Sequence, residues 1–195
     1  VADLDGEGAA LLAAEIGGLG VPIDVADPDS VDLALAAVRD RLGPITVLVS
    51  CAGWDLMRPF VETDEPFQER VLEINLGGPI RVARAVLPDM IEAGFGRIVL
   101  VSSDAARVGS SGEAIYAAAK GGLVSLAKSI AREVVRDGIT ANCVCPGATE
   151  TEVLAAMRVG VAEERGWPVD TALEWVMTEE WGMQVRSSVV ELQPR

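Results

Sequence analysis

The stretch RIVLV at residues 97–101 is an apolar run followed directly by two serines, Ser102 and Ser103. Two comparable runs flank it in the chain, ITVLV at 45–49 and ITANCV at 139–144. Helical composition fills the intervals, over residues 64–93 and 113–136. Buried strands that alternate with helices of about ten or more residues predict βαβ units, with a parallel sheet and helices on both faces.

The same alternation continues toward the start of the chain. Residues 1–4 resemble the tail of a strand, 6–16 predict a helix, 21–25 a short strand, and 27–42 a further helix. We expect the long helix over 64–93 to bend at Pro79 and Pro88. The fold class is therefore α/β, with a doubly wound parallel sheet whose ligands bind beyond the carboxyl ends of the strands.

Composition excludes several classes of function. The 195 residues contain 16 Lys and Arg against 30 Asp and Glu, a net charge of −14, and no His. An acidic chain is a poor partner for nucleic acid or an anionic membrane. Without His there is no Ser-His-Asp triad, no Cys-His pair and no His-ligated metal, so we expect no metal site. No apolar run is long enough to span a bilayer.

The three cysteines are Cys51, Cys143 and Cys145, and all lie in apolar stretches. An odd number of thiols in such surroundings predicts reduced cysteines buried in strands, and a cytoplasmic protein. A redox role for Cys51 is the alternative, which an apolar setting disfavours.

Tyr116 and Lys120 form the strongest local signal. Their spacing of four residues in a predicted helix places both side chains on one face. A nearby cation favours the phenolate, so the pair suits a general acid or base acting on a hydroxyl or carbonyl. Ser103, at the carboxyl end of its strand, would bond the same oxygen. The alternatives are a solvated pair on the helix surface and a serine that caps the turn.

Ser103, Tyr116 and Lys120 at this spacing resemble the catalytic signature of the short-chain dehydrogenase/reductase family, and Asn75 in LEINLGG resembles its fourth catalytic residue. The resemblance covers residues 1–152 and points to the subgroup with 2-hydroxycyclohexanecarboxyl-CoA dehydrogenase and 3-oxoacyl-carrier-protein reductase. It implies that Tyr116 is the general acid/base and that Lys120 lowers its pKa. Ser103 would polarise the substrate carbonyl, and Asn75 would hold a water in a proton relay.

The resemblance also implies a nicotinamide cofactor that exchanges a hydride with the substrate. Asp3 would bind the adenosine ribose, which favours NAD over NADP because a carboxylate repels a 2′-phosphate. The alternative for Asp3 is a helix N-cap. The implied cofactor-binding residues are Asp3, Asp24, Val25, Cys51, Ala52, Gly53, Tyr116, Lys120, Pro146, Gly147, Thr149 and Thr151.

Three features depart from the family pattern. No G-x-G-x-x-G motif is present, and with Asp3 as the ribose-binding acid the glycines fall before Val1, so we expect the first strand, phosphate loop and first helix to be missing. Ser50 and Cys51 stand where the family usually has two asparagines. Residues 1–152 would form a partial dinucleotide-binding domain, and 153–195 a divergent helical segment of that domain. There Trp167, Trp175 and Trp181 either line a substrate lid or cover apolar core.

The resulting hypothesis is an oxidoreductase for a secondary alcohol or ketone, on a ring or a CoA-linked acyl group. Trp54 and Arg107 would face that small molecule, or else cover the sheet edge and carry surface charge. The resemblance also implies a homodimer through the helices of Asn75 and Tyr116, where small residues would allow close approach: Ala117, Ala118, Ala119, Gly121 and Gly122. The alternative is a catalytically impaired remnant with an interaction role, and a metal-dependent hydrolase is disfavoured by the absence of His.

Overall fold

The computed structural model describes residues 1–147, 149, 159, 162–163 and 166–171. Contacts divide the chain into two compact units, Val1–Pro146 and Gly147–Arg195. The helical segment expected over 153–195 falls mostly outside the described residues, as do Trp175 and Trp181. The candidate site is therefore built from the first unit.

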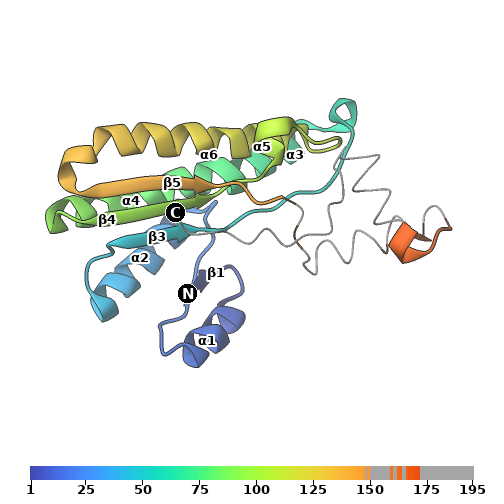
Figure 1. Cartoon of the computed structure of the whole chain (residues 1–195). Coiled ribbons are helices and arrows are strands. Elements are labelled where there is room, and N and C mark those ends of the chain that lie inside the picture. Colours follow the sequence, from blue (N-terminus) through green and yellow to red (C-terminus); the bar gives the residue numbers. More distant parts are fainter. Residues whose placement is uncertain (148, 150–158, 160–161, 164–165, 172–195) are drawn as a thin grey trace. The chain divides into compact units, whose positions relative to one another are not determined.

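The strands of the first unit pair in parallel, as the sequence predicts (Figure 1). β1 (Ala2–Asp3) pairs with β2 (Val21–Pro22). β3 (Val47–Ser50), β4 (Gly96–Val101) and β5 (Ile139–Val144) form a second sheet in the order β3-β4-β5. In-register pairing of β3 with β4 and of β4 with β5 brings the carboxyl ends of all three strands to one edge.

Helices connect these strands. They are α1 (Gly6–Glu15), α2 (Pro28–Leu42), α3 (Glu65–Leu72), α4 (Gly78–Ala93), α5 (Ala105–Val108) and α6 (Ala114–Glu133), with 3₁₀ turns at Phe60–Glu62 and Val135–Asp137. Over the described residues, none of these helices combines the length and apolarity that crossing a membrane requires.

A π-helical turn, Glu73–Gly77, joins α3 to α4. The sequence predicted bends at Pro79 and Pro88. Pro79 lies at the start of α4, where a missing N–H costs little, and Pro88 lies inside that helix. The irregularity falls at the π turn, which contains Asn75, and such turns recur at functional sites.

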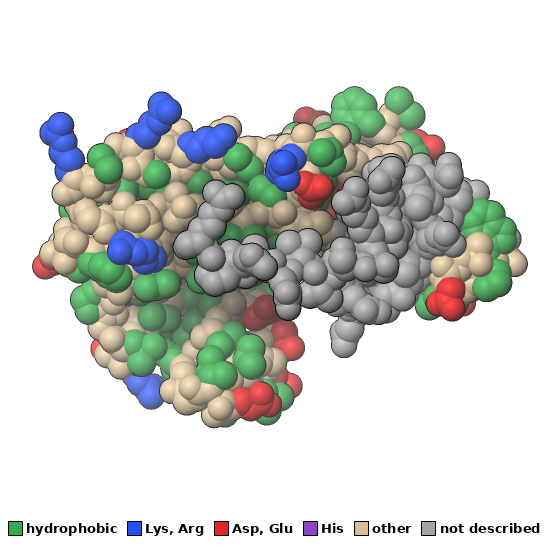
Figure 2. Space-filling model, in the orientation of Figure 1, with side chains coloured by type: hydrophobic (Ala, Val, Ile, Leu, Met, Phe, Trp, Pro, Cys, Tyr) green, Lys and Arg blue, Asp and Glu red, His purple; other side chains and the backbone are tan. Residues whose placement is uncertain are grey.

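The core lies on one face of the three-stranded sheet. Ile98 and Leu100 of β4 are fully buried and share one apolar cluster with side chains of α2, α4 and α6. On β3, by contrast, Val47 and Val49 are 55% and 57% exposed. The prediction of a buried strand over 45–49 is therefore wrong, because β3 is an edge strand of its sheet among the described residues. Hydrophobic side chains accordingly reach the surface in the space-filling view (Figure 2).

The prediction of strand-buried cysteines is wrong for Cys51, which is exposed, and only partly right for Cys143 and Cys145, which are half-buried. Cys51 follows the edge strand, so nothing described packs over it. All three are free thiols.

Candidate active site

The loops that follow β4 and β5 are joined at the carboxyl edge of the sheet. The Ser102 N–H donates to the Val144 carbonyl and the Asp104 N–H to the Pro146 carbonyl, each at 2.8 Å. These bonds extend the pairing of the two strands by a few residues. They fix Ser103 where the parallel-sheet rule places ligands.

Ser103 has two partners at this edge. Its hydroxyl accepts a hydrogen bond from the Ala105 N–H at 3.2 Å, so the turn-capping role is realised. The same side chain lies near Tyr116, in the first turn of α6, and lowers the pKa of that phenol. Two hydroxyl groups therefore meet beside the sheet edge, as the sequence predicts.

Lys120, one turn further along α6, is only 3% exposed. Its Nζ donates to the Val101 carbonyl at 3.0 Å and lies 5.4 Å from the centroid of the Tyr116 ring. Burial lowers the pKa of this ammonium, while the Cys143 and Cys51 thiols act in the opposite sense. The alternative of a solvated surface pair is therefore wrong.

Ser102, which was not among the predicted site residues, anchors this helix. Its buried hydroxyl donates to the Lys120 carbonyl at 2.7 Å and so ties α6 to the end of β4. The signal in the sequence was the pair of serines after an apolar strand, of which only the second was assigned a role.

The pKa of Tyr116 is raised above its ordinary value, opposite to the expectation from the sequence. Burial is the largest cause, and the Glu113 and Asp55 carboxylates add to it, whereas the hydrogen bond with Ser103 lowers the pKa. Lys120 lies over the ring and is not among the causes. Tyr116 is consequently a neutral phenol at neutral pH, suited to donate a proton.

Asn75 connects the central helix, which consists of α3, the π turn and α4, with the loop after β3. It is fully buried, and its Nδ2 donates to the carbonyls of Trp54 and Val71 while its Oδ1 accepts from the Trp54 N–H at 3.2 Å. A β-carbon at Gly53 would lie 3.0 Å from that Oδ1 and 3.3 Å from Lys120 Nζ. Gly53 thus lets the amide and the ammonium approach the backbone more closely than a side chain would allow.

Asp3 lies exposed at the end of β1, and its Oδ1 accepts from the Asp5 N–H at 3.0 Å. The helix cap is Asp5, which accepts from the Gly8 N–H at 3.1 Å. The N-cap alternative for Asp3 is therefore wrong.

Asp24 and Val25 follow β2 and are tied to neighbouring elements. The Asp24 N–H donates to the Ser30 hydroxyl at 2.9 Å. The Val25 carbonyl accepts from the guanidinium of Arg81, which also bonds Glu73 at the π turn. Arg81 was not predicted from the sequence, because its role depends on a contact between distant segments.

The residues present fit one end of a nicotinamide dinucleotide better than the other. The Lys120 ammonium, held at the carboxyl edge of the sheet by the Val101 carbonyl, suits the hydroxyls of the nicotinamide ribose. The diphosphate would need free N–H groups at a helix N-terminus. α1, which directly follows a strand, carries the Asp5 carboxylate at that position, whose charge opposes a phosphate.

The remaining predicted residues lie apart or outside the description. In the second unit the Thr149 hydroxyl donates to the Gly147 carbonyl at 3.1 Å, and Thr151 is outside the described residues. Arg107 is exposed and pairs with Asp104 at 3.1 Å, which matches its surface-charge alternative. The Trp54 ring lies against Phe67, and the Arg70 guanidinium lies over it, 4.0 Å from the centroid of the Trp54 ring.

No group of three or more Cys, Asp or Glu side chains in the described ranges is arranged to hold a metal ion.

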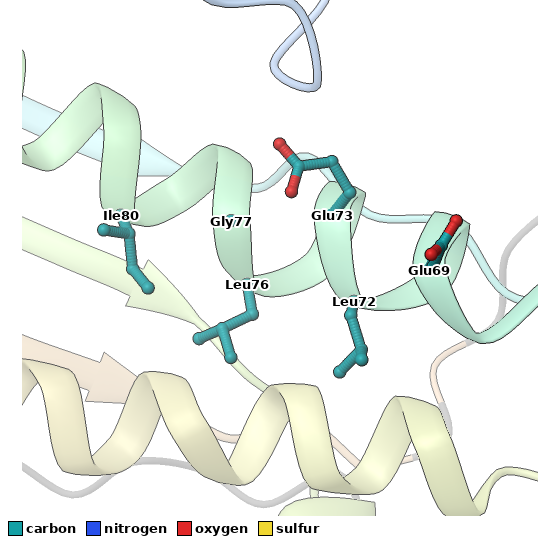
Figure 3. A pocket seen from close by; sticks show the side chains of 6 residues that line it. All are labelled: Glu69, Leu72, Glu73, Leu76, Gly77 and Ile80. Atoms are coloured by element: carbon teal, nitrogen blue, oxygen red, sulfur yellow. The ribbon is translucent and has the colours of Figure 1, made fainter. Parts of the chain in front are cut away.

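A hollow lies on the central helix, lined by Glu69, Leu72, Glu73, Leu76, Gly77 and Ile80. Leu72, Leu76 and Ile80 point to one side of the helix, toward α6 (Figure 3). A β-carbon at Gly122 of α6 would meet Leu76 at 2.9 Å, and Ala119 is fully buried. These two small residues of α6 therefore serve packing within the chain.

Comparison with known proteins places these observations in a family. The family model described as short chain dehydrogenase matches residues 1–161. The chain is 42% identical over 142 residues to the 3-oxoacyl-[acyl-carrier-protein] reductase MabA of Mycobacterium bovis, covering 71% of this chain and 56% of that protein. It is 36% identical over 140 residues to the reductase FabG of Escherichia coli, covering 72% and 57%.

Solved structures agree. A crystal structure of a variant of actinorhodin polyketide ketoreductase with NADPH superposes with a TM-score of 0.84 at 32% identity, covering 91% of this chain and 71% of that one. A short-chain dehydrogenase from Streptomyces avermitilis gives a TM-score of 0.73 at 33% identity, covering 78% and 57%. The chain spans a little over half the length of the curated relatives it matches. On the family model, the identities and the shared fold together, this chain belongs to the short-chain dehydrogenase family.

Proposed function

We propose that the chain carries the reacting end of an oxidoreductase that reduces a ketone to a secondary alcohol. The observation that carries this proposal is that Ser103 and Tyr116 meet at the carboxyl edge of the sheet, beside the buried Lys120. When bound, a nicotinamide cofactor supplies the hydride.

Each side chain then has a defined task. Ser103 orients the substrate carbonyl by donating a hydrogen bond to its oxygen. The Tyr116 hydroxyl protonates that oxygen as the adjacent carbon becomes tetrahedral, which leaves a phenolate to be reprotonated. Lys120, held by Val101, stabilises this transient phenolate electrostatically. The raised pKa of Tyr116 favours reduction over oxidation, because the phenol is the populated form.

Asn75 acts as a positioning residue in this proposal. Its amide fixes the backbone at Trp54, next to Gly53. The water-holding role implied by family resemblance remains a prediction.

We propose a 3-oxoacyl thioester as the substrate class, which includes acyl-CoA compounds. The names of the relatives support this, since two are 3-oxoacyl-[acyl-carrier-protein] reductases and one structure is a polyketide ketoreductase. A cyclic ketone is the second candidate, to be compared in the same assay.

For the cofactor we propose NAD(H), bound at its adenosine ribose by Asp3, with Asp24, Val25, Cys51, Ala52, Pro146, Gly147, Thr149 and Thr151 as further contacts. Asp3 is exposed and followed closely by Asp5, so two carboxylates oppose a 2′-phosphate. The ketoreductase structure carries NADPH, so the test compares both cofactors.

Asp3→Asn should raise kcat/KM with NADPH relative to NADH about tenfold, because the variant loses one repulsion of about 1.4 kcal/mol between the Asp3 carboxylate and the 2′-phosphate. Asp32→Asn, an exposed control, should leave the ratio unchanged.

We also propose a homodimer through the central helix and α6, in a cytoplasmic setting that fits three free thiols. Leu72 and Ile80 are each 40% exposed, so their hollow offers apolar surface to a second copy. Light scattering after gel filtration should give a dimer mass that Ile80→Glu reduces to a monomer. Leu33→Glu, on the exposed face of α2, is the control, and a monomeric wild type contradicts the interface.

The decisive experiment follows cofactor oxidation at 340 nm with a 3-oxoacyl thioester. Tyr116→Phe should reduce kcat/KM at least a hundredfold, the order of magnitude for a general acid, and Ser103→Ala should also impair turnover. Ser111→Ala, an exposed serine nearby, should not. Equal turnover in Tyr116→Phe and wild type would refute the proposal. Absence of both turnover and cofactor binding would favour the catalytically impaired remnant. The acidic cap of α1 and the exposed valines of β3 are consistent with that alternative.

A further inference from the structure

Two carboxyl groups lie beside Tyr116 and are not used in the mechanism above. Asp55 belongs to the loop after β3, and Glu113 directly precedes α6. The two loops are joined by a hydrogen bond from the Arg58 N–H to the Gly112 carbonyl at 2.9 Å. This bond holds the two carboxyl groups near one another and near the phenol, and both act electrostatically on Tyr116.

Neither carboxyl group has a cationic partner among the residues that the structure describes. The ion pairs in that part of the chain involve other acids, Asp64, Glu73, Asp89 and Asp104. Glu113 is hydrogen-bonded to Ser110, and one oxygen of Asp55 to the Leu56 backbone. The other oxygen, Asp55 Oδ2, is the buried side-chain polar atom that lacks a hydrogen-bond partner within the described ranges.

The charge at this place is negative under ordinary conditions. Burial raises the pKa of Asp55 to about 6 and also raises that of Glu113. Asp55 is still mostly ionised at neutral pH. The Lys120 ammonium lies over the tyrosine ring and bonds Val101 instead. A substrate carbonyl that reaches Tyr116 therefore comes close to two carboxylates that form no ion pair among the described residues.

We propose that Asp55 and Glu113 are specificity-determining residues that reject ketones bearing a free carboxylate close to the reacting carbon and admit neutral esters and thioesters. The inference rests on the proposed function, because it assumes that the substrate carbonyl binds at Ser103 and Tyr116. The physical reason is Coulomb repulsion in a partly desolvated site, where an effective dielectric constant of about 20 makes one close pair of like charges worth a tenfold change or more. A thioester or an ester is neutral at the position where the free acid carries its charge.

The test compares two substrates with one carbon skeleton, ethyl 3-oxobutanoate and 3-oxobutanoate, in the same cofactor-oxidation assay. The ratio of kcat/KM for the ester to that for the acid should fall about tenfold in Glu113→Gln and in Asp55→Asn, and further in the double variant. Glu133→Gln removes an exposed carboxylate from the far end of α6 and should leave the ratio unchanged.

A second readout needs no turnover. Tyr116 is the only tyrosine in the chain, so phenolate absorbance in an alkaline titration reports on it alone. Its pKa should fall in Asp55→Asn and Glu113→Gln and stay unchanged in Glu133→Gln. An unaltered ester-to-acid ratio with turnover intact, or an unaltered tyrosine titration, overturns the inference. Failure of wild type to reduce either ketone, while the titration shifts as expected, overturns the proposed function instead.

Discussion

Replacing Asn75 with alanine should destabilise the first unit more than any other single polar substitution at the candidate site. The side chain is fully buried and makes three hydrogen bonds, to the Val71 carbonyl and to both backbone groups of Trp54. A net hydrogen bond contributes about 1 kcal/mol, and buried partners left unpaired cost more, so we expect a loss of about 3 kcal/mol.

The assay is urea unfolding followed by tryptophan fluorescence, with Asn142→Ala as the matched control. Asn142 is exposed on β5, and its replacement should change the free energy of unfolding by less than about 0.5 kcal/mol. Because Trp54 is released with the amide, its emission should also shift toward that of solvent-exposed tryptophan. A loss below about 1 kcal/mol for Asn75→Ala, or an unchanged emission spectrum, would refute the assignment of Asn75 as the link between the π turn and the loop after β3.

Two further substitutions test the packing and the charges around the site. Gly53→Ala should reduce kcat/KM about tenfold, because the new β-carbon would lie 3.0 Å from Asn75 Oδ1 and 3.3 Å from Lys120 Nζ and would displace one of them. Equal kinetics would contradict this close approach. Asp89 accepts hydrogen bonds from Arg39 Nε and the Ile45 N–H, and its pKa is lowered chiefly by the Arg39 bond. A depressed pKa means that this stabilisation is present above the unfolded value near 4 and is lost as the pH falls through the folded value. Asp89→Asn should therefore cost about 1–2 kcal/mol at pH 7 and less near pH 2 in thermal unfolding, and a pH-independent difference contradicts the ion pair.

The sequence predicts much of the fold because the apolar runs are unambiguous. The run at 139–144 coincides with β5, and the run at 97–101 with all but the first residue of β4. The run at 45–49 is equally apolar, but its composition carries no information about which strands are present beside it. That is why the exposure of Val47 and Cys51 was not foreseen.

The site was predictable to the extent that it depends on helical spacing and strand ends. Tyr116 and Lys120 share a face of α6 by spacing alone, and Ser103 follows β4 closely. Asp55 and Glu113 were missed because their neighbourhood arises where two irregular loops meet, and loop conformation leaves no periodic signal. The direction of the pKa shift of Tyr116 was missed for the same reason, since it depends on burial and on these two carboxylates.

The most direct test of the central claim is the alkaline titration of the single tyrosine, Tyr116, in the wild type and in Ser103→Ala. If the phenol is half-buried and lies beside Ser103, its pKa lies above the ordinary tyrosine value in the wild type and rises further in the variant, because the serine hydroxyl lowers it. A wild-type pKa at the ordinary value that Ser103→Ala leaves unchanged would mean a phenol in water, and would contradict the active site described above.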